Sequence, residues 1–154
     1  MAARVNGSVP AAEKERHSRR NIFQTKGDIM SVTFFEGTPR NPPLPFSPAV
    51  RAGNFVFISG QVARGANGEI VSGGIEAQTR QVMANMEAAL KLAGCTLDDV
   101  IKVTIWLDDA RDFNGFNKTY AEYFPNNKPV SSTVQSALMI VGKLEVEAIA
   151  YKED

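Results

Sequence analysis

The sequence is poor in the residues on which several classes of site depend. Its 154 residues include one cysteine, Cys95, and one histidine, His17. A single cysteine excludes a disulfide bond within the chain and is typical of a reducing compartment. A metal centre would need aspartate and glutamate ligands, and no spacing of these residues suggests one. The sequence therefore predicts neither a disulfide framework nor a metal site.

Long apolar runs and an excess of one charge are also missing. No apolar run approaches the roughly 18 residues that a transmembrane helix needs. The N-terminal residues carry scattered charges and lack the apolar segment of a secretory signal. Lysine plus arginine equals aspartate plus glutamate at 17 each, so the chain as a whole has no charge excess for nucleic acid. We therefore expect a cytoplasmic protein that binds neither a membrane nor nucleic acid.

Residues 1–30 differ in composition from the rest of the chain. They hold six lysine or arginine residues against three acidic ones, a net charge of +3, whereas residues 31–154 have a net charge of −3. Because few large apolar side chains occur in residues 1–30, we expect a polar, basic extension that is flexible or lies on the surface. A basic arm that grips a partner is the alternative. A mitochondrial-type presequence is disfavoured because two glutamates interrupt the basic residues.

Residues 31–154 have the length and composition of one globular domain. The whole chain is 44% hydrophobic and 22% charged, which is ordinary for a soluble protein with a real core. Apolar residues at helical spacing predict helices over about 74–92 and 112–124. β-prone runs predict strands over 31–35, 54–59, 100–107, 131–135 and 144–151, with a hairpin arm over 69–71 as a further strand. Five prolines exclude a central strand or helix between residues 37 and 48.

Two helices with one apolar stripe each can cover only one face of the sheet that these strands form. The other face carries residues such as Phe55, Phe57 and Trp106 and needs cover from elsewhere. An uncovered apolar sheet face on a chain of this size is an interface, so the pattern predicts an oligomer.

The last predicted strand, Leu144–Tyr151, alternates apolar residues with Glu145, Glu147, Ile149 and Tyr151. Because Ile149 and Tyr151 share a face with the two glutamates, we expect that face to be only partly exposed to solvent. A glutamate in such a place is solvated, paired, or placed for chemistry, and the alternation does not choose among the three.

Three ordered motifs carry a resemblance to a known family. They are SGQVA at Ser59–Ala63, AGCTLDDVIKVTIWLDDARDFNGFNKTYAEYF at Ala93–Phe124, and LEVEAIA at Leu144–Ala150. Together they resemble the reactive intermediate deaminase family (RidA, also called YjgF or L-PSP) over about residues 45–151.

The resemblance implies a chorismate-mutase-like α+β fold, with a mixed sheet and two helices on one face. It also implies a homotrimer that binds small organic metabolites in clefts between subunits. The activity that it implies is hydrolysis of imines and enamines to 2-keto acids and ammonia, without a metal or an organic cofactor.

The resemblance also assigns residues to the cleft. Glu147 matches the acid of the last strand, which positions water and shuttles protons in such chemistry. The substrate-binding residues that it assigns are Phe46, which stands where the family usually has a tyrosine, together with Ser59, Gly60, Asn117, Ser131 and Thr133.

The main departure from the family is at Ser131. The deaminase motif reads proline, small residue, arginine, serine, and here Pro129 and Val130 precede Ser131 and Ser132. An arginine fork holds a substrate carboxylate in two parallel hydrogen bonds, which a serine does not reproduce. Loss of such a charged contact costs about 2–5 kcal/mol.

Three functions fit the sequence. The first is imine or enamine hydrolysis of deaminase type with altered specificity, because Glu147 and Asn117 are in place. The second is binding of a metabolite by a non-catalytic trimer, because the arginine is lost. The third is endoribonuclease activity or translation inhibition, which has been attributed to some members of the family. It fits least well, because residues 31–154 contain no histidine and have no excess of basic residues.

Overall fold

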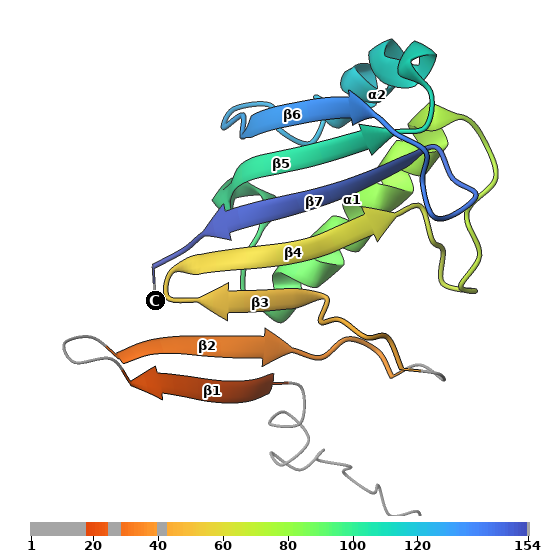
Figure 1. Ribbon diagram of the computed structural model, residues 1–154. Coiled ribbons are helices and arrows are strands. Elements are labelled where there is room, and N and C mark those ends of the chain that lie inside the picture. Colours follow the sequence, from red (N-terminus) through yellow and green to blue (C-terminus); the bar gives the residue numbers. More distant parts are fainter. Residues whose placement is uncertain (1–17, 25–28, 40–42, 154) are drawn as a thin grey trace, which may run out of the picture.

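The computed structural model describes residues 18–24, 29–39 and 43–153. One seven-stranded sheet, in the order β1-β2-β3-β4-β7-β5-β6, is backed by two α-helices (Figure 1). Every neighbouring pair of strands is antiparallel except β5 and β6, which are parallel. The strands are β1 Ser18–Gln24, β2 Ile29–Phe35, β3 Ala49–Ala52, β4 Phe55–Val62, β5 Val100–Leu107, β6 Val130–Gln135 and β7 Leu144–Tyr151. The helices are α1 Ile75–Leu92 and α2 Phe113–Tyr120, with short 3-10 turns at Leu97–Asp99 and Ala110–Asp112.

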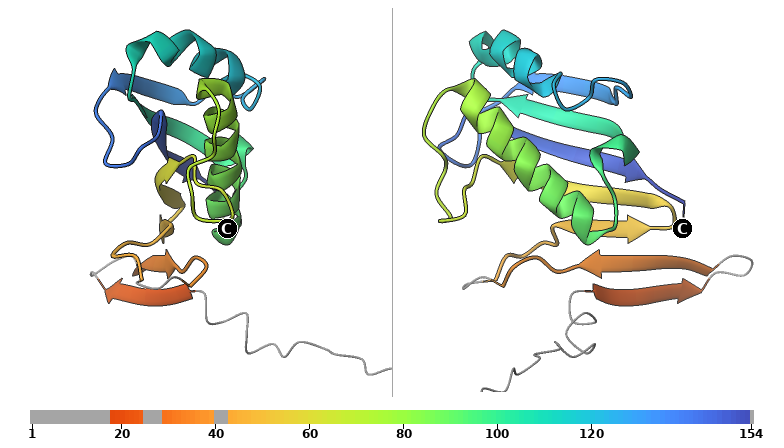
Figure 2. Two further views of the ribbon diagram at one scale, coloured as in Figure 1. Left: turned by 90° about the vertical axis from the view of Figure 1, so that its right-hand side faces the viewer. Right: turned by 180° about the vertical axis from the view of Figure 1, so that it is seen from behind.

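The predicted α+β class and the two helices on one face of a mixed sheet are confirmed (Figure 2). Strands β5 and β7 have the predicted bounds. Helix α2 ends at Tyr120, four residues before the predicted end, although Phe124 is still buried in the core. The expected hairpin arm at residues 69–71 is reduced to an isolated bridge between Arg64 and Ile70.

The N-terminal part of the sheet contains two strands that the sequence did not predict. Strand β3 is only four residues long and follows the proline-rich loop directly. Strand β1 lies within the stretch expected to be an extension and pairs along its whole length with β2. Strand β2 begins at Ile29, so it crosses the boundary that the sequence predicted between the extension, residues 1–30, and the domain, residues 31–154. His17 lies outside the described residues.

The core fills the space between the sheet and the helices. Alternate residues of β4, β5 and β7 point toward α1, and Val56, Val146 and Leu90 are completely buried there. Gly94 ends α1 in the left-handed conformation, with φ of +70°, as its position after the helix predicts. Cys95 is 4% exposed and packs in this core as a small buried side chain. Burial raises the pKa of its thiol.

The opposite face of the sheet, called the open face below, is not covered by either helix (Figures 1 and 2). Phe55 and Phe57 lie on it with 44% and 46% of their surface exposed. The ring of Phe55 meets that of Tyr151 edge-on, with a centroid separation of 5.3 Å. The uncovered apolar face that the sequence predicted is therefore present in the single chain.

Candidate functional site

An irregularity in the pairing of β4 with β7 lies at the predicted acid. Ile58 pairs with Ala148 and Gln61 pairs with Val146, so Ser59 and Gly60 together stand opposite Glu147. Two residues facing one is a β-bulge, a feature that re-aims side chains and occurs often beside active sites. The Glu147 side chain is exposed on the open face.

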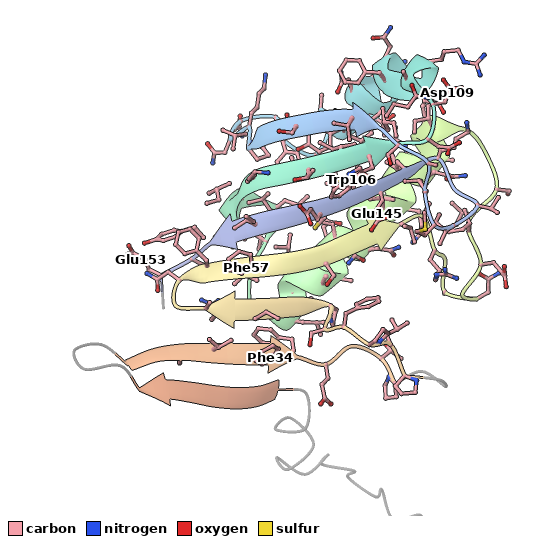
Figure 3. All side chains as sticks on the ribbon, viewed as in Figure 1. Phe34, Phe57, Trp106, Asp109, Glu145 and Glu153 are labelled. Atoms are coloured by element: carbon pink, nitrogen blue, oxygen red, sulfur yellow. The ribbon has the colours of Figure 1, made fainter. Side chains whose placement is uncertain are left out.

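Glu145 lies closer to the bulge than the sequence indicated. A Cβ atom at Gly60 would overlap the carboxylate of Glu145, so that carboxylate lies directly against the Gly60 backbone. In the ladders, Glu145 stands between Val62 of β4 and Trp106 of β5, and it is half-buried. Figure 3 shows Glu145 and Trp106 on the same open face. Because its carboxylate packs against the strand backbone beside Glu147, Glu145 is a second candidate acid.

Ser59 joins the bulge to the proline-rich loop. Its hydroxyl donates a 2.6 Å hydrogen bond to the Ser47 carbonyl, and its N–H donates a 3.1 Å bond to the Pro48 carbonyl. Phe46, which is 56% exposed, directly precedes this anchored pair. Phe46, Ser59, Gly60, Glu145 and Glu147 are called the acid group below.

The remaining predicted site residues lie on the other side of the sheet. Ser131 pairs with Val103 and Thr133 pairs with Ile105, and both partners are buried beneath the helices. Because paired residues of neighbouring strands share a face, Ser131 and Thr133 point to the helix side. Asn117 is exposed on α2, which lies on that side as well. Asn117, Ser131 and Thr133 are called the serine group below. A single chain does not bring the two groups together.

Two lysines of the described residues, Lys143 and Lys102, bind other side chains. Lys143 Nζ lies 2.8 Å from Asp112 Oδ2, and the hydrogen bond to this carboxylate raises the pKa of Lys143. A lysine is a conceivable replacement for the cation that the family arginine supplies, and this ion pair opposes that role for Lys143. On the open face, Lys102 Nζ donates a 3.0 Å hydrogen bond to Thr104 Oγ1, and Thr104 is the ladder partner of Glu147.

The described residues hold neither a metal-ligand cluster nor a membrane-spanning helix. Over residues 18–24, 29–39 and 43–153, no three histidine, cysteine, aspartate or glutamate side chains come together as metal ligands would. Neither described helix combines the length and the apolar character needed to cross a bilayer.

Comparisons with known proteins agree with the fold and the motifs. The family model described as endoribonuclease L-PSP matches residues 38–152. A RutC family protein of Pyrococcus horikoshii is 50% identical over 127 residues, which cover 81% of this chain and 100% of that protein. The human 2-iminobutanoate/2-iminopropanoate deaminase is 39% identical over 110 residues, 70% of this chain and 80% of that protein.

Solved structures show the same architecture. The crystal structure of RidA from an Antarctic Psychrobacter superposes with a TM-score of 0.68 at 35% identity, and the match covers 71% of this chain and 89% of that one. The matched residues include the acid group, the serine group and both helices. The chain therefore belongs to the reactive intermediate deaminase family, also known as RidA, YjgF or L-PSP.

Proposed function

We propose that this protein hydrolyses a small imine or enamine to a carbonyl compound and ammonia, with a specificity different from that of keto-acid imine deaminases. The reaction takes place in a cleft between the subunits of a homotrimer. The observation that carries the proposal is the acid group, in which a carboxylate packs against a glycine of a bulged strand. The names of the relatives, including the human 2-iminobutanoate/2-iminopropanoate deaminase, support the reaction class.

The chemistry needs few protein groups. The enamine first tautomerises to the imine, and water then adds to the imine carbon. In the resulting carbinolamine the hydroxyl proton passes to the nitrogen, the C–N bond breaks, and ammonia leaves as the C=O bond forms. A carboxylate beside the cleft positions the water and transfers the protons. Glu147 is our first candidate for this role, and Glu145 is the second because its carboxylate is held against Gly60.

A cleft between subunits accounts for the division of the predicted site residues. The two glutamates of the acid group lie on the open face, and the serine group lies on the helix side near the edge strand β6. A second copy seated on the open face would supply its own serine group to the acid group of the first. The exposed Phe55 and Phe57 favour such an association.

Ser131 carries the proposal of altered specificity. The serine side chain is exposed and uncharged, so it offers a single hydroxyl in place of a guanidinium. The same observation favours the alternative function, in which the trimer binds a metabolite without turning it over. The two functions differ in one measurable property, the release of ammonia.

The first experiment measures ammonia release from 2-aminoacrylate and from a panel of imines with and without a carboxylate. We expect turnover on at least one member of the panel, and a loss of about 100-fold or more in Glu147→Gln or in Glu145→Gln. Glu87→Gln, an exposed glutamate on α1, is the matched control and should retain the wild-type rate.

The results separate the alternatives. Full activity in both variants would remove the two carboxylates from the mechanism. Loss in only one variant assigns the role to that residue. A wild-type protein that turns over nothing on the panel, yet is thermally stabilised by a panel compound, is the metabolite-binding trimer.

A second experiment restores the guanidinium. Ser131→Arg should raise kcat/KM for keto-acid imines by about 30-fold or more, because one charged contact to a carboxylate is regained. Ser132→Arg, at the next position of β6, is the matched control and should give no gain. Since Phe46 has also lost the family hydroxyl, the double variant Ser131→Arg with Phe46→Tyr is measured alongside. No gain in either variant would mean that Ser131 does not set the specificity.

A further inference from the structure

A separate pocket lies beyond the end of β4. The segment 64–73, which follows β4, forms one wall, and the loop 136–143, which precedes β7, forms the other. The pocket has a volume of about 550 Å³. Its lining includes no member of the acid group or the serine group. The proposed hydrolysis therefore assigns nothing to it.

The backbone of Arg64, on the first wall, is held from several sides. The Arg64 N–H donates a 2.7 Å hydrogen bond to the Val62 carbonyl, and Arg64 pairs with Ile70 in an isolated bridge. Asn85 Nδ2 of α1 donates 2.9 Å hydrogen bonds to the carbonyls of both Val62 and Arg64. The guanidinium thus projects from a fixed point and makes one described hydrogen bond, from Nη1 to the Gly68 carbonyl.

The two walls are joined through Gln78, a side chain of α1 that is only 7% exposed. Its Oε1 accepts a 2.9 Å hydrogen bond from the Lys143 N–H, and its Nε2 donates a 3.4 Å bond to the Val71 carbonyl. Lys143 is held further by its carbonyl, which accepts from the Asp108 N–H at 2.9 Å, and by its ion pair with Asp112. These bonds fix the two walls relative to each other at Val71 and Lys143, as a small-molecule site requires.

The rest of the lining is mostly apolar. Ile70 and Val71 come from the first wall, and Ile140 and Val141 come from the second. Val141 is 95% exposed although its loop is anchored at Lys143, which leaves a branched side chain free to contact a ligand. Among the described lining residues, Arg64 is the only cation, and Glu69 is an exposed carboxylate.

We propose that this pocket binds a small branched-chain carboxylate. The carboxylate would accept a pair of hydrogen bonds from the Arg64 guanidinium, which is the group that recognises it best. The alkyl branch would lie among the four aliphatic side chains, where each buried methylene adds to the affinity. The inference rests on the pocket alone and stands whether or not the protein is a hydrolase.

The test is an NMR titration of the full-length protein with isovalerate. We expect saturable shifts in the amides of residues 64–73 and 138–143. The uncharged isostere isoamyl alcohol should bind about tenfold more weakly or worse, since it lacks the carboxylate. Acetate should also bind more weakly, because it lacks the branch. Added salt should weaken isovalerate binding and leave the alcohol unaffected.

Variants at one position check the assignment of the guanidinium. Arg64→Met should weaken isovalerate about tenfold or more, and Arg64→Lys should weaken it less, since the charge remains. Arg111→Met, which removes an exposed arginine elsewhere, should change nothing. Equal binding of isovalerate and isoamyl alcohol by the wild type would overturn the proposal without any variant. Shifts centred on Gly60 and Glu145, an absence of saturable shifts, or unchanged binding in Arg64→Met would also overturn it.

Discussion

The two faces of the sheet are formed by the same strands, but they differ in burial and in polarity. On the helix face, Val56, Val103 and Val146 are between 0% and 1% exposed. One residue further along each strand, Phe57, Thr104 and Glu147 point to the open face, where Phe57 is 46% exposed and Glu147 is also exposed. The period-two alternation thus separates stability from function within each strand. In these three strands, substitutions on the helix face should act on folding, and those on the open face on assembly or chemistry.

The open face is itself divided along its length. Phe55 and Phe57 begin β4, and their neighbours Ile149 and Tyr151 end β7. Beyond them, β4 bulges at Ser59 and Gly60, and the two glutamates of β7 follow. Figure 3 shows Phe57 and Glu145 at different ends of this face. The aromatic end is suited to contact with another copy, and the bulged end holds the polar groups needed for chemistry.

The largest effect on stability is expected from a substitution on the helix face. Leu90→Ala removes a completely buried side chain of α1 and should lower the free energy of unfolding by about 2–5 kcal/mol, because a cavity remains. Leu92→Ala, on the same helix but 38% exposed, is the matched control and should cost about 1 kcal/mol or less. Urea unfolding measures both. Equal losses would mean that burial in the single chain does not decide stability, and the comparison of faces would fail.

On the open face, we expect a substitution to change the stability of the single chain little and its assembly strongly. Phe57→Ser should shift the native mass from trimer toward monomer, because about 1.5–3 kcal/mol of apolar burial is lost per copy. Leu92→Ser, which removes a 38% exposed leucine from α1, should leave the mass unchanged. Light scattering after size exclusion gives the mass. A monomeric wild type, or a Phe57→Ser variant that remains trimeric, would exclude the open face as the interface.

Much of this fold follows from periodicity, and the exceptions have physical causes. Strands β5 and β7 have the predicted bounds, because β7 presents an unbroken apolar face of four residues and β5 is a continuous β-prone run in which Val103, Ile105 and Leu107 alternate. The stripe of α2 continues past Tyr120 to Phe124, which is buried from the segment after the helix. Side-chain spacing therefore overestimated the length of the helix. Strand β3 escaped prediction because four residues are too few to show a period.

The site was less predictable than the fold. The alternation of residues in the last strand predicted that Glu145 and Glu147 share one face, and the resemblance to the family identified Glu147 as the acid. The contact between Glu145 and Gly60 depends on how β4 shifts against β7, which no single strand reveals. The signal in the sequence was Gly60 itself, since a glycine within a strand marks a bulge or a close approach. That Ser131 lies on the helix side likewise follows from its pairing with Val103 and not from its own strand.

The smallest effect on stability is expected from a buried polar atom on the helix face, the hydroxyl oxygen of Tyr120. The Tyr120 ring lies between Phe116 and Phe124, at centroid distances of 5.2 Å and 4.9 Å. In the part of the chain that the structure describes, its hydroxyl is a buried side-chain atom without a hydrogen-bond partner. Tyr120→Phe should therefore raise the free energy of unfolding by about 1 kcal/mol at neutral pH. Tyr151→Phe is the control, because that hydroxyl donates to Glu153 and accepts from Asn54, and its loss should give no gain.

The pH dependence sharpens this test. Burial raises the pKa of Tyr120 above its ordinary value of 10.0. Above that value the unfolded chain releases the phenolic proton while the folded chain retains it, so stability present at neutral pH is lost as the pH rises. The stability gap between Tyr120→Phe and the wild type should therefore widen above about pH 10. A gap that stays constant in urea unfolding up to about pH 11 would mean that the phenol ionises as easily in the folded protein as in the unfolded chain. The core around Tyr120 would then be more accessible to water than its contacts indicate.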